Sequence, residues 1–290
     1  VREQGTGAPI SGAQVTLMKE RSGPPPSGMA FERPPQTTTD SAGRFVFRSV
    51  APGRYRFGAQ KAGFAMPFGP AAMPAAVDVA ANIDTIEIIL PRGGVLTGRV
   101  LDASGEPIAN AMVSAMRPRP EFPARAGAPP RPPLPRLVMA GPAGQTNELG
   151  EFRIHSLAAG EYVVRVMARP YEQSATASPD GHATTLVPTY APGTTDPDAA
   201  DAVAVQAGGT VHVGDIRLVS APSFRVAGTV VDAGGRPVAG ALIRLTPADP
   251  AADMLPMSGP MGANRTDGRG AFTLDGVVNG AYILVAIAPV

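Results

Sequence analysis

The sequence predicts an all-β protein: three tandem seven-stranded antiparallel Greek-key β-sandwiches, of which the first and last are truncated. One segment, TDSAGRFVFRSVAPGRY at residues 39–55, recurs at equal length as TNELGEFRIHSLAAGEY at 146–162 and TDGRGAFTLDGVVNGAY at 266–282. Recurrence at equal length indicates a repeated structural unit. Gly (34) and Pro (33) are abundant without a collagen-like period, which favours many turns between short strands. Apolar and polar residues alternate over short runs, as in half-buried strands.

The charge and the residue counts exclude several classes of function. The formal net charge is +1, so no nucleic-acid partner is expected. The chain has no cysteine, which excludes disulfides, thiolate zinc sites and cysteine nucleophiles. No apolar run reaches the ~18–20 residues that a helix needs to cross a bilayer, so no membrane span is expected.

Each unit is expected to contain a strand, a tight turn and a second strand before the 17-residue segment. The second-strand block reads GAPISGAQVTL at 7–17, GEPIANAMVSA at 105–115 and GRPVAGALIRL at 235–245. In the second and third copies a further strand precedes it, TGRVLDASGEP and AGTVVDAGGRP. The first copy lacks most of that strand, so we expect the chain to be a fragment of a longer protein. A proline fixes φ just after each turn, at Pro9, Pro107 and Pro237.

The recurring 17-residue segment is expected to be a β-hairpin. The Asp or Asn at its second position can accept hydrogen bonds from the backbone of its own turn, and its first glycine can supply a positive φ. The closing tyrosine is expected to pin a corner through a hydroxyl bond to nearby backbone; the alternative is that its ring stacks on a ligand. The structural signature residues are Gly43, Phe45, Gly53, Tyr55, Gly150, Phe152, Gly160, Tyr162, Gly270, Phe272, Gly280 and Tyr282.

Two further strands are expected to complete the first and second units, at 75–80 with 83–90 and at 201–207 with 210–219. We therefore predict units at residues 1–92, with the first strand truncated, 93–220, and 221–290, with the C-terminal strands missing. About seven short strands with no long helical period indicate two facing sheets in each unit.

The two blocks together resemble the carboxypeptidase regulatory-like domain, which is a transthyretin-like (prealbumin-like) β-sandwich close to the Cna B-type and starch-binding-like sandwiches. The second and third copies carry the whole pattern, and the first carries all but its first strand. The resemblance implies non-catalytic modules. In that family they accompany metallopeptidase domains or TonB-dependent outer-membrane receptors, or occur in tandem in bacterial surface and periplasmic proteins. Cna B-type relatives can hold an internal isopeptide bond, for which Lys19 is the one plausible lysine here.

Residue patterns for chemistry are weak, and we predict no catalytic, cofactor-binding or metal-binding residue. Serine hydrolase signatures are missing, and the histidines share no metal-ligand spacing: His155, His182 and His212. Two loops leave an alternative open. Asp196, Asp198 and Asp201 could hold calcium or be solvated acids, and Met254, Met257 and Met261 could hold Cu(I) or pack down on the fold.

Each unit also carries a Pro-rich excursion between its second strand and the 17-residue segment, at 21–35, 117–136 and 247–262. Equivalent topology predicts that all three leave their sandwiches at the same end. They are interpreted as tolerated surface insertions, with the alternative of a contact surface anchored by Phe31 and Phe122.

The predicted function is that of a non-enzymatic spacer or interaction region of a larger bacterial envelope or secreted protein, outside the cytoplasm (periplasm, outer membrane or secreted). One alternative is carbohydrate binding, with Tyr171 and Tyr190 as the platforms for sugar rings. Another is a regulatory appendage of a metallopeptidase or a TonB-dependent receptor. The expected partner is a polysaccharide or another envelope protein, and no cofactor is expected.

Overall fold

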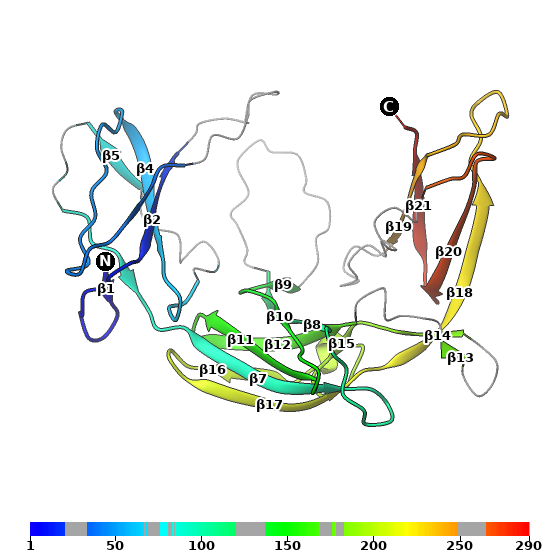
Figure 1. The fold of residues 1–290 in the computed structure, drawn as a ribbon, viewed down its shortest axis with the longest axis horizontal. Coiled ribbons are helices and arrows are strands. Elements are labelled where there is room, and N and C mark those ends of the chain that lie inside the picture. Colours follow the sequence, from blue (N-terminus) through cyan, green and yellow to red (C-terminus); the bar gives the residue numbers. More distant parts are fainter. Residues whose placement is uncertain are drawn as a thin grey trace.

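The computed structural model describes residues 1–20, 34–66, 68, 76–80, 83, 85–119, 137–168, 176–177, 183–248 and 265–289. The fold is all-β: the described residues form strands and one short 3-10 turn, Pro197–Ala199, and contain no α-helix. Figure 1 shows three groups of strands that follow one another along the chain, coloured blue to cyan, cyan to yellow, and yellow to red. None of the described segments is a helix that could cross a membrane.

The middle group has two sheets. One has the order β11-β7-β17 and consists of β7 (Gly94–Leu101), β11 (Glu151–Leu157) and β17 (Thr210–Arg217). The other is centred on β8 (Met112–Pro118) and β12 (Gly160–Met167). Four shorter strands extend that second sheet: β9 (Leu137–Met139), β10 (Gly144–Gln145), β15 (Thr189–Tyr190) and β16 (Ala202–Val205). One hydrophobic cluster takes buried side chains from both sheets, as a sandwich requires.

The N-terminal group repeats this plan with fewer strands. A four-stranded sheet has the order β3-β2-β4-β5, and β1 pairs with β6 on the other side of the core. The strands are β1 (Arg2–Glu3), β2 (Gln14–Lys19), β3 (Gln36–Thr38), β4 (Gly53–Gln60), β5 (Ala76–Val79) and β6 (Ile89–Leu90).

In the C-terminal group, β18 (Ser220–Thr229) pairs with β20 (Ala271–Val278), and β19 (Leu242–Pro247) pairs with β21 (Tyr282–Ile287). The start of β18 also pairs with β14 (Ala183–Leu186), which in turn pairs with β13 (Thr176–Ala177). This ladder joins the middle and C-terminal groups through one continuous strand.

Most of the ladders among the described residues are antiparallel, as the sequence predicts. Two are parallel: β1 with β6, and β7 with β17. In both cases the first and last strands of a unit lie side by side, which the sequence pattern alone does not indicate.

The prediction that the 17-residue segment forms a β-hairpin is wrong. Its two strands lie in different sheets: β11 pairs with β7, whereas β12 pairs with β8, β15 and β16. The segment is therefore an arch that crosses the core. At the same position of each copy the backbone is left-handed, with φ of 55° at Ser49, 60° at Ser156 and 76° at Gly276. In the second and third copies the ladder shifts register at this residue, and such a bulge bends a strand out of its sheet.

Candidate functional site

The most elaborate polar site is the turn that opens each 17-residue segment, and its first residue is a buried threonine. The hydroxyl of Thr146 accepts a hydrogen bond from the Ala111 amide at 2.8 Å and donates one to the Ile108 carbonyl at 2.7 Å. Thr39 and Thr266 make the equivalent pairs of bonds. The threonine thus fastens the turn to the strand of the preceding block. Sequence reasoning noted its recurrence and missed this role.

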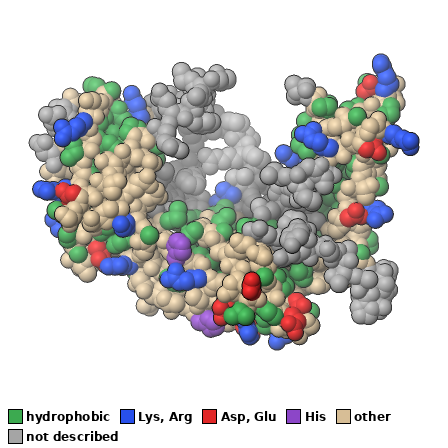
Figure 2. All heavy atoms as spheres, viewed as in Figure 1, with side chains coloured by type: hydrophobic (Ala, Val, Ile, Leu, Met, Phe, Trp, Pro, Cys, Tyr) green, Lys and Arg blue, Asp and Glu red, His purple; other side chains and the backbone are tan. Residues whose placement is uncertain are grey.

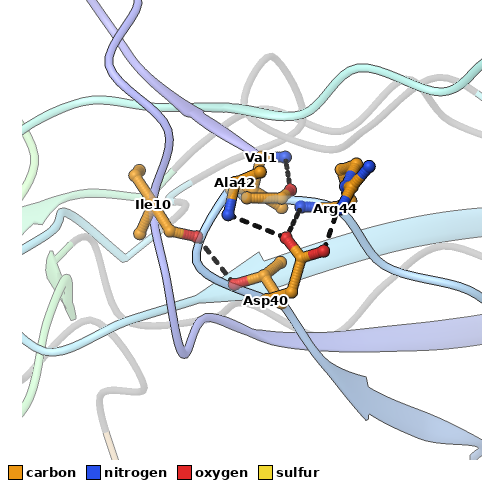
Figure 3. A network of polar contacts seen from close by, with 7 residues as sticks. Val1, Ile10, Asp40, Ala42 and Arg44 are labelled. Carbon is orange, nitrogen blue, oxygen red and sulfur yellow. Dashed lines mark hydrogen bonds and ion pairs between the residues drawn. The ribbon is translucent and has the colours of Figure 1, made fainter.

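The next residue closes the turn. The side-chain oxygen of Asp267 accepts hydrogen bonds from the amides of Arg269 and Ala271, both at 2.8 Å. Asp40 and Asn147 accept equivalent pairs, so the prediction of side-chain-capped turns is confirmed. Figure 3 shows the first copy, in which Asp40 faces Ala42 and Arg44.

Hydrogen bonds to these carboxylates lower their pKa values. The Arg44 and Ala42 amides and the Arg44 guanidinium hold the pKa of Asp40 below its ordinary value. The Ala271 and Arg269 amides do the same for Asp267. The causes are local to the turn, so these shifts indicate turn formation rather than a catalytic environment.

The first glycine of each segment is required by geometry. Gly150 has φ of 72°, and a Cβ added to it would lie 2.4 Å from the Val100 carbonyl oxygen. Gly43 and Gly270 have φ of 71° and 72° and approach the equivalent carbonyls equally closely. The carbonyl of each glycine also accepts a hydrogen bond from the neighbouring strand, from the nitrogens of Val1, Val100 and Val230. In the first copy that donor is the backbone nitrogen of Val1 (Figure 3).

The closing tyrosines pin the arch. The hydroxyl of Tyr162 donates to the Ala158 carbonyl at 2.6 Å, and the ring is 1% exposed. Tyr55 and Tyr282 donate to the carbonyls of Ala51 and Val278 at 2.8 and 3.1 Å. Burial raises the pKa of Tyr162. The expected corner bond is confirmed. The Tyr55 and Tyr162 rings are buried in the core, and the Tyr282 ring is partly buried and packs against it.

Tyr190, expected to offer a ring face to a sugar, is 2% exposed at the edge of the middle sheet. That expectation is wrong, because a ring enclosed by protein cannot stack on a polysaccharide. The other proposed contact residues lie outside the described residues: Phe31, Phe122 and Tyr171.

The residues that the sequence offered as possible metal ligands do not converge on a common point among the described residues. The Asp196 carboxylate accepts a hydrogen bond from the Asp198 amide and caps the 3-10 turn. Among the described residues, no three His, Asp or Glu side chains converge as metal ligands would. His155 and His212 each contact a neighbouring hydroxyl, of Ser156 and Thr97, while His182, Met254, Met257 and Met261 fall outside the described part of the chain. The Lys19 ammonium lies over the Tyr55 ring, 5.9 Å from its centroid.

The roots of the Pro-rich excursions are described even though most of their residues are not. The first excursion leaves the end of β2 and returns as β3, which pairs antiparallel with β2. The second leaves β8 at Pro118 and returns at Leu137, its direct partner in the ladder. The third leaves the equivalent strand, β19, and its return passes Arg265, which bridges to Leu242. All three are therefore rooted on the equivalent strand.

The N-terminal unit also has an open groove of about 930 Å³. Its lining includes Phe45, Phe47 and Phe57, whose ring centroids lie 6.1–6.4 Å apart. Val1 and Glu87 also line it. On the face of the molecule shown in Figure 2, basic and acidic side chains are interspersed and do not gather into one patch.

Comparison with known proteins connects this geometry to a family. Residues 1–83 match the family model of the carboxypeptidase regulatory-like domain. No curated protein matches the chain.

Three solved structures that resemble the chain are bacterial pilins. The minor pilin of the Gram-positive pathogen Streptococcus agalactiae is 17% identical over 74% of this chain and 87% of that chain, with a TM-score of 0.32. A streptococcal ancillary pilin is 13% identical over 96% and 84%, with a TM-score of 0.29. The shaft pilin SpaA of Lactobacillus rhamnosus GG is 12% identical over 78% and 89%, with a TM-score of 0.26. Such low scores carry no functional argument for this chain. Residues 1–83 are similar to the carboxypeptidase regulatory-like domain, and the sequence motif of that segment recurs at 146–162 and 266–282.

Proposed function

We propose that the chain is a non-catalytic array of three β-sandwich modules, at residues 1–92, 93–220 and 221–290. In this proposal it acts outside the cytoplasm as a spacer or interaction region of a larger bacterial envelope or secreted protein. The observation that carries the proposal is the direct attachment of each unit to the next, since a spacer must hold its ends in a fixed relation.

The attachment of the first unit to the second is tight. The Met66 amide donates to the Ser156 carbonyl at 2.9 Å, and the Gly93 amide donates to the Gly63 carbonyl at 2.9 Å. Phe68 packs against the core of the middle unit. The Arg117 guanidinium lies 5.3 Å from the ring centroid of Phe68 and 4.9 Å from that of Tyr162, a geometry in which cation–π attraction adds to packing.

The second unit is joined to the third without a flexible spacer. The Val187 amide donates to the Val219 carbonyl at 3.0 Å, and β18 begins at the next residue, Ser220. The first part of β18 pairs with β14, and the remainder pairs with β20. Because one strand belongs to ladders on both sides of the boundary, bending there would break backbone hydrogen bonds.

The polar residues of the recurring motif support a structural role as well. Threonine, Asp or Asn, and tyrosine are all engaged with nearby backbone in each copy. These bonds give each side chain a structural role in its own turn or arch. We therefore infer that the motif serves folding and that the units do no chemistry.

Distance measurement between spin labels tests the spacer. Ala42, Leu149 and Arg269 are exposed and occupy the same position in the three turns, and the chain has no native cysteine. Double variants Ala42→Cys with Leu149→Cys, and Leu149→Cys with Arg269→Cys, are each expected to give one narrow distance distribution. Broad distributions in both would show independent modules on flexible joints and contradict the proposal.

A further inference from the structure

The last arch of the chain carries an asparagine directly before a glycine. Asn279 and Gly280 lie between β20 and β21, and both are exposed. The exposure belongs to this position of the unit, because Pro52 and Ala159 precede the equivalent glycines of the other two copies and are exposed as well. No other asparagine of the sequence is followed by glycine. The third copy alone therefore presents a side-chain amide at this corner.

The groups of this pair are not held in place. Among the described residues, neither the side-chain amide of Asn279 nor the backbone nitrogen of Gly280 has a hydrogen-bond partner. Asn147 and Asn110 differ, because the side-chain oxygen of each accepts hydrogen bonds from neighbouring groups. The Asn279 side chain is thus able to turn toward the nitrogen of the next residue, whereas the other two are fixed.

We propose that Asn279 is a site of spontaneous deamidation, at which the chain converts an asparagine to aspartate and isoaspartate. The Gly280 nitrogen gives up its proton and attacks Cγ of Asn279. An N–Cγ bond forms, the Cγ–Nδ2 bond breaks, and ammonia leaves with the proton. The succinimide ring that results takes up water from the solvent. Attack of water on the side-chain carbonyl gives aspartate, and attack on the main-chain carbonyl gives isoaspartate.

The glycine allows this ring to close. A side chain at position 280 would crowd the nitrogen as it approaches Cγ, whereas glycine has no Cβ and leaves the backbone a wider choice of φ. The second step needs water, and residues 279 and 280 are exposed to it. The reaction therefore requires neither a catalytic side chain nor a cofactor.

Two Asp-Gly pairs in the same unit are protected from the equivalent ring closure. The Asp267 carboxylate, which precedes Gly268, accepts hydrogen bonds from two turn amides at 2.8 Å. The Asp275 carboxylate, which precedes Gly276, accepts one from Nε of Arg225 at 2.7 Å. A carboxylate held in its ionised form is a poor electrophile, and these bonds keep it from rotating toward the next nitrogen. The asparagine pair in the arch is thus the reactive one of this unit.

Isoaspartate at position 279 lengthens the arch, because its main chain runs through Cβ and Cγ and gains a carbon. The hydroxyl of Tyr282 donates to the Val278 carbonyl at 3.1 Å and so spans the altered link. The Ala248 amide donates to the Ala281 carbonyl at 2.8 Å just beyond it. A longer main chain between these points pushes the ends of the arch apart and weakens both bonds. The modification therefore loosens this corner of the C-terminal unit.

The test is incubation of the folded chain at mildly alkaline pH, followed by ion-exchange separation and peptide mapping by mass spectrometry. We expect a more acidic form to accumulate, with the amide-to-acid mass change greatest in the peptide that contains Asn279. Electron-transfer fragmentation should identify isoaspartate in that peptide. Asn147 and Asn110 are internal controls and should stay intact. Asn279→Ala is the matched variant, since alanine holds this position at Ala159, and it should not form this species.

Hydrogen exchange of the Ala248 amide measures the structural consequence. In the separated isoaspartate form its protection should fall about two- to tenfold, which is the loss expected for one hydrogen bond. Freshly prepared Asn279→Asp carries the same charge without the extra carbon and should keep its protection. An equal fall in Asn279→Asp would contradict the lengthened arch and assign the effect to charge.

Two results would overturn the deamidation site itself. One is an Asn279 that stays intact in the folded chain; reaction in the urea-unfolded chain alone would then show that the fold protects it. The other is deamidation of Asn147 as fast as that of Asn279, which would mean that the held and unheld side chains do not differ.

Discussion

At the scale of single residues, this protein is organised by side chains that fix the backbone at turns. The same few residue types recur because each copy has the same local geometry. In each, a glycine lies close to the carbonyl of the neighbouring strand, one residue is left-handed, and an Asp or Asn side chain caps the turn. How much each of these residues contributes to stability depends on the atoms around it as well as on its residue type.

Replacing Gly150 by alanine is expected to lower the stability of the middle unit by about 2–5 kcal/mol. A left-handed L-residue costs roughly 1–2 kcal/mol, and the new Cβ would press on the Val100 carbonyl, an overpacking cost of ~1–3 kcal/mol. Gly105→Ala is the control, since Gly105 has φ of 93° with nothing near its added Cβ. Native-state hydrogen exchange of the Val164 and Val166 amides measures both. Equal losses of stability in the two variants would mean that the close approach of Gly150 to the Val100 carbonyl contributes nothing.

The turn capped by an aspartate and the turn capped by an asparagine are expected to respond differently to acid. The folded pKa of Asp267 is lowered by its turn amides. The stability it contributes is therefore present above its ordinary pKa of about 3.9 and is lost as the pH falls through the lower folded value. The protection of the Arg269 and Ala271 amides should fall over this range, whereas the amides capped by the uncharged Asn147, those of Leu149 and Glu151, should not change.

Asp267→Asn is the decisive variant for that prediction, because Asn147 shows that an amide oxygen can cap the same turn. The variant turn should form at neutral pH and lose its acid dependence. Acid dependence that persists in Asp267→Asn would trace the effect to another group.

At the scale of elements, the arch between the two sheets is the feature that distinguishes this unit from a simple meander. Its strands are close in sequence, yet each finds its partner elsewhere in the unit. The left-handed residue at Ser156 turns the chain out of one sheet, and the tyrosine hydroxyl holds it where it enters the other.

Removing that hydroxyl tests the arch. Tyr162→Phe is expected to cost about 1–2 kcal/mol, because the Ala158 carbonyl loses its partner. Tyr282→Phe should cost less, since its bond is longer (3.1 against 2.6 Å) and its ring is only half-buried. Hydrogen exchange of the amides in β12 measures the effect of Tyr162→Phe, and that of the amides in β21 measures the effect of Tyr282→Phe. A larger loss in the C-terminal unit would show that the hydroxyl bond is not what pins the arch.

At the scale of the whole molecule, the proposed array depends on the junctions between its units. Gly93 lies at the first junction, and a Cβ there would be 2.7 Å from Cα of Ser156 and 3.0 Å from the Phe64 carbonyl carbon. Both neighbours are backbone atoms, one in each adjoining unit, so neither can move without shifting its unit.

Gly93→Ala is therefore expected to broaden the distance distribution between labels at Ala42→Cys and Leu149→Cys while both cores stay folded. The control is Gly268→Ala, which adds a Cβ with nothing within 4 Å and should leave the distribution unchanged. An unchanged distribution in Gly93→Ala would place the rigidity of the junction elsewhere.

The sequence by itself determined the repeat, the all-β class, the capped turns and the tyrosine bonds. These depend on residues within a few positions of one another, whose geometry is local. Only the tertiary structure decided that the 17-residue segment is an arch, that β7 and β17 run parallel and that Tyr190 is enclosed. The alternation of apolar and polar residues along a strand shows which side chains face the core. It does not show which other strand pairs with it. That choice is made by backbone groups far apart in sequence.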